Sequence, residues 1–196
     1  MLNRFRMPGL PFYSAAVIFI LKCISGLALA WIYTKIYRDR STADVFKLFD
    51  DSKHLFEAFY HNPRDYWSMI LGLDRGTPYY DVYFSNMGNW NKSFDSGLAL
   101  LNDNRSIIRL HALIRIISFD SYAVHVFIFN LMSLVGLIAI YKSFVTWFQG
   151  REYLLAMTVF LMPSVLCWSS GLLKEAPLMM LVGLTISILL RWNSKG

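Results

Sequence analysis

Charged residues are scarce in this sequence. Only 16% of the residues are charged and 56% are hydrophobic, whereas a soluble globular domain has about 25% charged and about 45–50% apolar residues. The mean hydropathy is +0.41. The apolar runs are too long for the core of a soluble domain of this size, so the composition predicts an integral membrane protein.

Motifs for several kinds of chemistry are also missing. The two cysteines, Cys23 and Cys167, both lie in apolar segments, which argues against a disulfide framework. The four histidines lack the spacing of zinc ligands, and there is no phosphate-binding glycine loop, nucleophile elbow or zinc-protease motif. The sequence therefore predicts no metal centre, and no cofactor beyond a divalent ion that a carboxylate near the membrane could position.

The basic residues are distributed as membrane anchors. The net charge is +6, yet the stretch from Arg38 to Arg105 has eight Lys or Arg and ten Asp or Glu. The remaining positive charge clusters at the ends of apolar runs, where it sets membrane topology. A nucleic-acid binder would gather that charge on one surface. We therefore expect the lipid bilayer as a partner and no nucleic acid.

Four apolar runs predict an all-α integral membrane protein with about four transmembrane helices, in a single membrane domain. The predicted helices cover residues 12–37, 121–147, 152–168 and 172–192, and a hydrocarbon core needs about 20 residues. Trp147, Trp168 and Trp192 lie at run ends, as in interfacial aromatic belts. The first run is too long and too aromatic at its end for a cleaved signal peptide, so we expect it to be retained.

Three residues interrupt these predicted helices. Lys22 is charged within an otherwise apolar run, and we expect it to face a partner helix or a polar cavity, because a charge in lipid is costly. Pro163 and Pro177 lie inside or at the start of their helices. There they predict kinks more than breaks, because neighbouring helices can satisfy the freed carbonyl groups.

The positive charges also predict the orientation. They precede the first helix, flank the link between the second and third, and follow the fourth: Arg4 and Arg6, Lys142 and Arg151, Arg191 and Lys195. With four crossings all of them fall on one side, which the positive-inside rule makes cytoplasmic. We therefore expect both termini in the cytoplasm.

Residues 38–120 form a large, partly helical extracytoplasmic loop in this prediction. Residues 41–60 alternate an apolar stripe with a polar face that includes Asp44 and Asp51, the pattern of an amphipathic helix lying on the membrane. Residues 106–119 show the same period, with Arg115 among the polar positions.

Two polar features of the outer side are candidates for chemistry. Asp44 could act as a general base on a hydroxyl acceptor, although with Ser41 as the cap it also fits a capping box. Lys174 and Glu175 end a polar turn between apolar runs, and ionisable residues at membrane depth are functional candidates. Mutual pairing, or snorkelling of the lysine to headgroups, is the structural alternative.

Residues 42–49, Thr-Ala-Asp-Val-Phe-Lys-Leu-Phe, are similar to the acidic-then-aromatic start of the outer loop in multi-spanning glycosyltransferases of the C superfold. These enzymes use polyprenyl-phosphate-linked donors. Residues 130–137 and 163–175 resemble bacterial, Bacteroidetes-like membrane proteins of the same type. The chain thus resembles the N-terminal part of such an enzyme.

The resemblance implies a site and a location. Asp44 would be the catalytic residue that activates the acceptor hydroxyl, while Lys174 and Glu175 would lie beside the phosphate of a polyprenyl-linked sugar donor. Independently of the resemblance, we expect Arg115 to help Lys174 to bind the phosphate, and Asp51, two turns beyond Asp44 on the same helix face, to help to bind substrate. The location would be the bacterial inner membrane, and the reaction would belong to envelope glycan assembly.

Other interpretations stay open. Full members of that superfamily have more helices, whereas this chain ends just after its fourth apolar run, so we expect it to be incomplete at the C-terminus or to need a partner membrane subunit. A non-catalytic membrane subunit or truncated fragment is the main alternative. A polysaccharide polymerase or flippase component would carry several intramembrane arginines, and here only Lys22 is clearly intramembrane.

Overall fold

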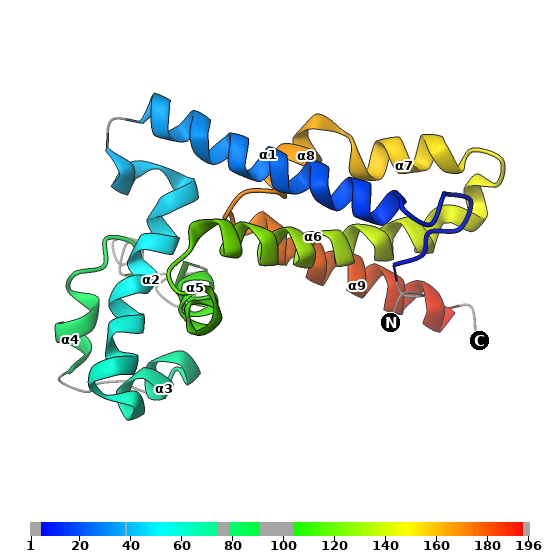
Figure 1. The fold of residues 1–196 in the computed structure, drawn as a ribbon. Helices are drawn as coiled ribbons and strands as arrows, with labels where there is room; N and C mark the ends of the chain where they lie inside the picture. The colour runs from blue at the N-terminus through cyan, green and yellow to red at the C-terminus, as the bar shows by residue number, and fades with distance from the viewer. Residues whose placement is uncertain (1–4, 38, 74–78, 91–103, 194–196) are drawn as a thin grey trace, which may run out of the picture. The chain divides into compact units, whose positions relative to one another are not determined.

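The computed structural model describes residues 5–37, 39–73, 79–90 and 104–193. It is 79% helix, and no strand occurs in those ranges, which confirms the all-α class there. The chain divides into two compact units (Figure 1). The membrane unit comprises Met1–Ile32 and Val126–Gly196, and the loop unit comprises Tyr33–His125.

Three helices are long and apolar enough to span a membrane. They are α1 (Ser14–Ile36), α6 (Tyr122–Phe144) and α9 (Glu175–Asn193), and the 3-10 turn η5 (Val145–Phe148) extends α6. Their apolar side chains leave little for water to solvate, so the bilayer is the solvent that suits them. The described residues thus contain three candidate spans, which supports the prediction of a membrane protein.

The third predicted span consists of two short helices. These are α7 (Glu152–Phe160) and α8 (Pro163–Trp168). Met162 between them has an extended ψ of 125°, because a proline disfavours helical geometry in the residue before it. The expectation of a kink at Pro163 is therefore wrong, since the helix breaks there and Pro163 begins the next one. Pro177 lies in the first turn of α9, where its missing N–H costs nothing.

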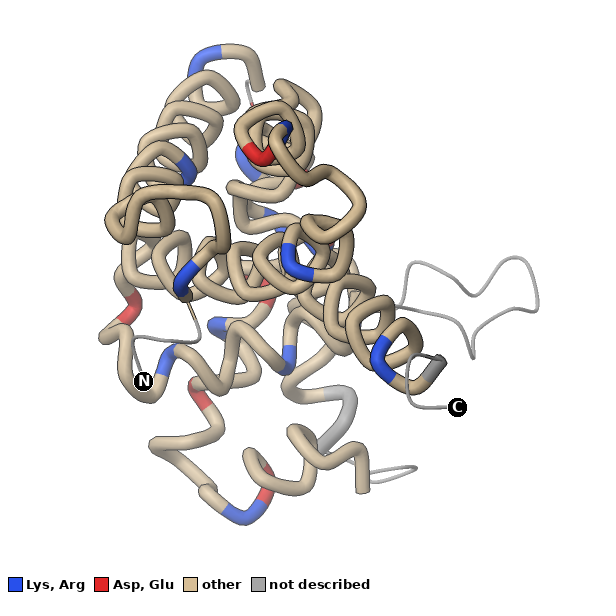
Figure 2. Tube along the Cα trace, turned by 90° about the vertical axis from the view of Figure 1, so that its right-hand side faces the viewer, with Lys and Arg blue, Asp and Glu red and all other residues tan. Residues whose placement is uncertain are grey.

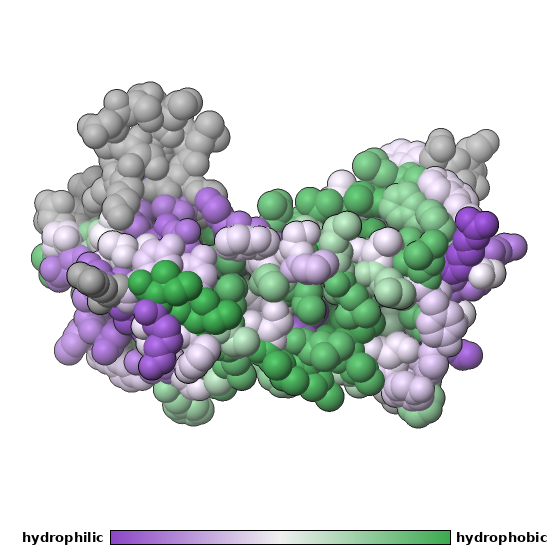
Figure 3. Space-filling model, turned by 90° about the horizontal axis from the view of Figure 1, so that it is seen from above, coloured by the Kyte–Doolittle hydropathy of each residue, from purple (hydrophilic) through white to green (hydrophobic). Residues whose placement is uncertain are grey.

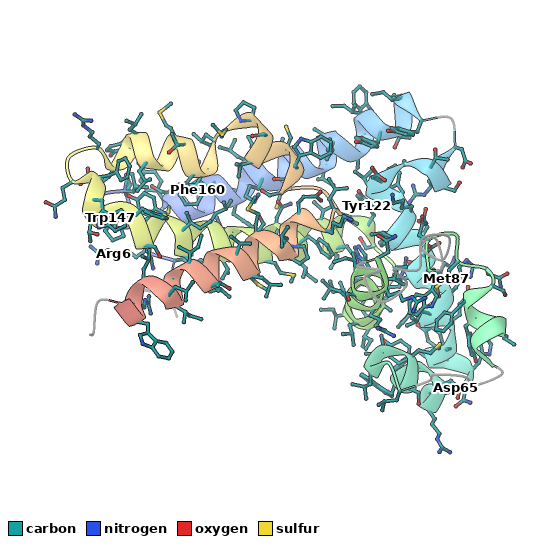
Figure 4. The ribbon with its side chains drawn as sticks, turned by 180° about the vertical axis from the view of Figure 1, so that it is seen from behind. Arg6, Asp65, Met87, Tyr122, Trp147 and Phe160 are labelled. Carbon is teal, nitrogen blue, oxygen red and sulfur yellow. The ribbon has the colours of Figure 1, made fainter. Side chains whose placement is uncertain are left out.

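The core of the membrane unit joins segments that are far apart in the sequence. Buried apolar side chains from α1, α6 and α7 form one cluster, in which Tyr141 and Phe160 have ring centroids 5.8 Å apart. Figure 4 labels Phe160 between the helices. The outward side chains are also apolar, with Ile24 and Leu181 each 59% exposed, and hydrophobic colour covers much of this unit in Figure 3. Few charged positions interrupt its long helices (Figure 2).

The loop unit is built on two amphipathic helices. They are α2 (Asp44–His61) and α5 (Asn104–Ser118), accompanied by the 3-10 turn η2 (Arg40–Thr42) and by the shorter helices α3 (Pro63–Leu71) and α4 (Tyr79–Phe84). The apolar stripe of α2 packs against α5 and α3, and Leu55 on this stripe is fully buried. The sequence had predicted that this stripe faces the membrane, but most of it packs within the loop unit.

Candidate functional site

Lys22 is the centre of a polar cluster inside the membrane unit. Its side chain is fully buried. The ammonium nitrogen donates to the Ser169 carbonyl oxygen at 3.1 Å, to Ser169 Oγ at 2.7 Å and to Ser170 Oγ at 3.0 Å. These three bonds use all the donors of a lysine. The sequence predicted a partner helix or a polar cavity for Lys22, and the structure shows that its partners lie in a polar turn.

The two serines lie in a non-helical turn, residues 169–174, that links α8 to α9 and is buried except for its last residue. The turn packs closely on α1, because a Cβ added at Gly26 would come within 2.1 Å of the Ser170 carbonyl oxygen. The same oxygen accepts a 3.0 Å bond from Asn130 Nδ2 of α6. Asn130 is eight residues into α6, roughly 12 Å from its start. Non-helical backbone at such depth is stable only where protein encloses it.

The charge of Lys22 has no carboxylate partner among the described residues. Its three acceptors are a carbonyl and two hydroxyls. Asn130, which bonds the Ser170 carbonyl, and Ser133 on the same helix each have a side-chain oxygen that is buried without a hydrogen bond in the described structure. A buried charge normally has a counter-charge, and buried polar atoms normally have partners. The cluster is therefore an uncompensated positive centre within the helices.

Lys174 and Glu175 follow this turn directly. Lys174 is exposed, and Glu175 is half-buried as the first residue of α9. One oxygen of the Glu175 carboxylate, Oε2, is buried and accepts no hydrogen bond from a described residue. An acidic residue in the first turn favours the helix electrostatically. The start of the turn thus contacts the buried ammonium of Lys22, and its end carries the exposed ammonium of Lys174.

Asp44 begins α2 and is exposed. Its carboxylate, 53% exposed, forms an ion pair with Lys47 one turn along. The predicted capping box is wrong, because Ala43 is the N-cap of α2 and no side chain caps it. Ser41 instead bonds the Asp39 carboxylate through its N–H, at 2.9 Å, and its hydroxyl, at 2.8 Å. These bonds lower the pKa of Asp39 and hold residues 40–42 in the turn η2.

Asp51 is buried and fully engaged. Its carboxylate accepts bonds from the Gly88 N–H at 3.2 Å, the Asn89 N–H at 2.8 Å and Asn89 Nδ2 at 2.9 Å. Asp51 therefore ties the segment after α4 to the middle of α2. The sequence placed Asp51 on the polar face but gave no sign of its partners.

Arg115 is also buried, and it joins α5 to α2. It donates to Ser52 Oγ at 2.8 Å and to the Phe49 carbonyl oxygen at 2.5 Å, and its guanidinium carbon lies 4.2 Å from the centroid of the Phe49 ring. An ion pair with Asp120 completes its contacts. Burial lowers the pKa of Arg115 to about 10, against the opposing effect of nearby carboxylates, so the side chain stays charged at neutral pH.

The predicted site residues are divided between the two units. Asp44, Asp51 and Arg115 belong to the loop unit, while Lys174 and Glu175 belong to the membrane unit. Within the loop unit, Asp44 is exposed whereas Asp51 and Arg115 are buried with separate partners. These three residues therefore do not converge on one another.

A buried histidine pair is an additional feature that the sequence did not indicate. His111 Nδ1 lies 2.9 Å from His125 Nδ1, and His125 Nε2 lies 2.8 Å from Ser118 Oγ. Burial, with the charges of His125 and Arg115, holds the pKa of His111 well below its usual value. The two histidines sit on different helices, so no spacing rule links them. No group of three or more metal-binding side chains occurs in the described part of the chain.

In the part of the chain that the structure describes, the fold is all-helical and contains three helices long and apolar enough to span a membrane. Comparison of the chain with protein-family models, with curated proteins and with solved structures found no match. Its function therefore has to be inferred from its own residues.

Proposed function

We propose that this chain acts in the transfer of a sugar from a lipid-linked sugar phosphate to an acceptor on the extracytoplasmic side of the bacterial inner membrane, in envelope glycan assembly. The observation that carries the proposal is the Lys22 cluster. A buried ammonium without a carboxylate partner among the described residues raises the local positive potential. An anionic phosphate bound beside the 169–174 turn would be stabilised by that potential.

The exposed end of the turn supplies the contact residue in this proposal. Lys174 is exposed and follows the buried serines within a few residues, and a lysine binds phosphate as a compact point charge. Glu175 would then orient the donor headgroup through the oxygen that accepts no hydrogen bond from a described residue. Stabilising charge that develops on a leaving phosphate is a strong catalytic contribution.

Asp44 is the proposed general base for the acceptor hydroxyl. Its carboxylate is exposed, and its partner Lys47 forms a surface ion pair, a kind of contact worth only about 0–1 kcal/mol. An acceptor hydroxyl can therefore displace Lys47 at low cost. Asp51 and Arg115 are proposed to maintain the shape of the loop unit, because both are already engaged by internal partners.

We further propose that α7 and α8 together form a fourth crossing, which would put both termini in the cytoplasm. In that arrangement Arg6, Arg151 and Arg191 fall on one side, as the positive-inside rule requires. Alkaline phosphatase fused after Arg151 should be inactive, and fused within the 169–174 turn it should be active. The reverse pattern would overturn the orientation.

The catalytic proposal is tested by complementation. In a bacterial strain that lacks its own copy, the wild-type chain should restore the envelope glycan profile and Asp44→Asn should not. Glu57→Gln is the matched control, because Glu57 is an exposed acid of the same helix that pairs with His54. Restoration by Asp44→Asn at the same protein level would rule out Asp44 as the base.

A non-catalytic membrane subunit is the second candidate. Asp51 and Arg115 favour this candidate, because both are bonded to internal partners. Of the site residues predicted in the loop unit, Asp44 is then the one with an exposed carboxylate. This candidate predicts that Asp44→Asn and Lys174→Gln both retain complementation. It also predicts that a partner membrane protein co-purifies with all variants.

A further inference from the structure

A groove in the membrane unit lies between the start of α1 and the middle of α6. Its volume is about 570 Å³, within the range of about 300–1,000 Å³ typical of ligand sites. The walls are apolar, formed by Phe12, Ala15, Ala16, Phe19, Leu131 and Leu134. Both helices are candidate spans, so the groove would open toward the hydrocarbon region of the bilayer.

One positively charged side chain, that of Arg6, is part of this otherwise apolar lining. Arg6 lines the groove and is exposed, with no hydrogen bond or ion pair to any residue that the structure describes. Figure 4 shows Arg6 at the end of the membrane unit that also carries Trp147. Arginine beside tryptophan is the usual composition of a membrane–water interface. The groove thus combines an apolar channel with a guanidinium at headgroup level.

The segment that carries Arg6 is held firmly on the helices. Met7 is buried in the core, and the Tyr141 hydroxyl donates a 2.6 Å bond to the Pro8 carbonyl oxygen. Gly9 has a φ of +78°, and a Cβ there would come within 2.4 Å of the Glu152 side chain. Because three successive residues are fixed in this way, the position of Arg6 at the groove is set by the fold.

We propose that this groove binds one anionic phospholipid, with an acyl chain between α1 and α6 and its phosphate on Arg6. An acyl chain matches the apolar walls, and the lipid phosphate supplies the negative charge that Arg6 lacks among the described residues. A guanidinium binds phosphate with two parallel hydrogen bonds. This site is separate from the Lys22 cluster and does not depend on the proposed glycosyl transfer.

Native mass spectrometry of the full chain in detergent tests the proposal, with phosphatidylglycerol and phosphatidylcholine as probes. We expect the wild-type protein to retain one phosphatidylglycerol in preference to phosphatidylcholine. Arg6→Gln should weaken phosphatidylglycerol binding about fivefold, the equivalent of one interfacial cation. Ala16→Trp should fill the groove and abolish retention of both lipids, and Leu131→Trp serves as a second filling variant.

Two matched variants control for charge and bulk. Arg151→Gln removes another exposed arginine that does not line the groove, and Ala28→Trp adds bulk at an exposed alanine of α1 away from it. Both should bind phosphatidylglycerol like the wild type. Equal retention of the two lipids with no effect of Arg6→Gln would overturn the proposal. The proposal would also be overturned if the wild type were a dimer and Ala16→Trp dissociated it, because the groove would then be an interface between two copies.

Discussion

Gly183 of α9 lies directly against the backbone of Gly136 in α6. A Cβ built on Gly183 would come within 2.1 Å of the Gly136 carbonyl oxygen, and one on Gly136 would come within 2.1 Å of the Met179 carbonyl oxygen. Small residues allow such close approach of membrane helices, where packing rather than the hydrophobic effect drives association. The α6–α9 contact is therefore set by two glycines.

Replacing Gly183 by alanine should push the two helices apart. The clash is with backbone atoms, which cannot rotate away, so we expect a loss of about 1–3 kcal/mol in the free energy of unfolding. The thermal midpoint of the detergent-solubilised protein measures this loss. Gly88→Ala is the control, because nothing lies within 4 Å of a Cβ there. An equal midpoint for both variants would contradict the close contact.

Asp51→Ala should destabilise the loop unit. The substitution leaves the Asn89 N–H and amide, and the Gly88 N–H, without their acceptor, so we expect a loss of about 2–3 kcal/mol in the free energy of unfolding. The neighbouring Asp50→Asn is the control. Its pair with Arg40 is at the surface and should be worth less than about 1 kcal/mol.

Hydrogen exchange can locate this effect. Amide protons of α2 and of the turn around Asn89 should exchange faster in Asp51→Ala than in the wild type, while those of α9 should not change. If Asp51→Ala and Asp50→Asn unfolded at the same temperature, the buried bonds of Asp51 would contribute nothing measurable.

The loop unit should become less stable in mild acid. The pKa of His111 in the folded state lies well below its ordinary value of 6.5, so the unfolded chain binds a proton that the folded chain excludes. The free energy of unfolding should be steady above about pH 7.5 and should decrease below about pH 6.5, by up to about 1.4 kcal/mol per pH unit.

Thermal midpoints measured across this range test the histidine. His111→Asn, which cannot titrate, should make the decline shallower even if it lowers the midpoint at neutral pH, and part of the decline should remain because the buried partner His125 is still present. His54→Gln, at a partly exposed histidine paired with Glu57, should keep the decline. A decline as steep in His111→Asn as in the wild type would assign the acid sensitivity to other groups.

Local sequence patterns predicted the helices better than the hydrogen-bond partners of their polar side chains. The apolar run around Lys22 was sufficient to predict α1, because a span depends on length and composition alone. The partners of Lys22 are 147 and 148 residues away, and no single-sequence pattern reports such a distance. Asp51 and Asn89, 38 residues apart, illustrate the same limit within the loop unit.

Two predictions failed through local competition. Ser41 matched a capping box, but the Asp39 carboxylate, two residues earlier, takes the Ser41 N–H and hydroxyl, which leaves Ala43 as the N-cap. At Pro163 a kink and a break were both sterically allowed. The break occurs where Met162 is extended and α8 starts afresh, because the proline ring disfavours helical geometry in the residue before it.

Lys22→Met separates a structural role of the ammonium from a functional one. Methionine has a similar length and removes the cost of burying a charge without a carboxylate partner in the described residues, but it also leaves the three acceptors of Lys22 without their donor. Because these two effects oppose each other, we expect the free energy of unfolding to stay within about 1 kcal/mol of the wild type. Complementation of the envelope glycan profile should nevertheless be lost, because the positive potential beside the 169–174 turn is gone.

Ser170→Ala is the companion variant. It retains the charge but removes one of its three acceptors, so it should lower the free energy of unfolding by about 1–3 kcal/mol. Because the ammonium remains, any folded protein should keep its activity. If Lys22→Met were instead the less stable of the two and still complemented, Lys22 would be a structural pin between α1 and the turn, and the phosphate proposal would lose its support.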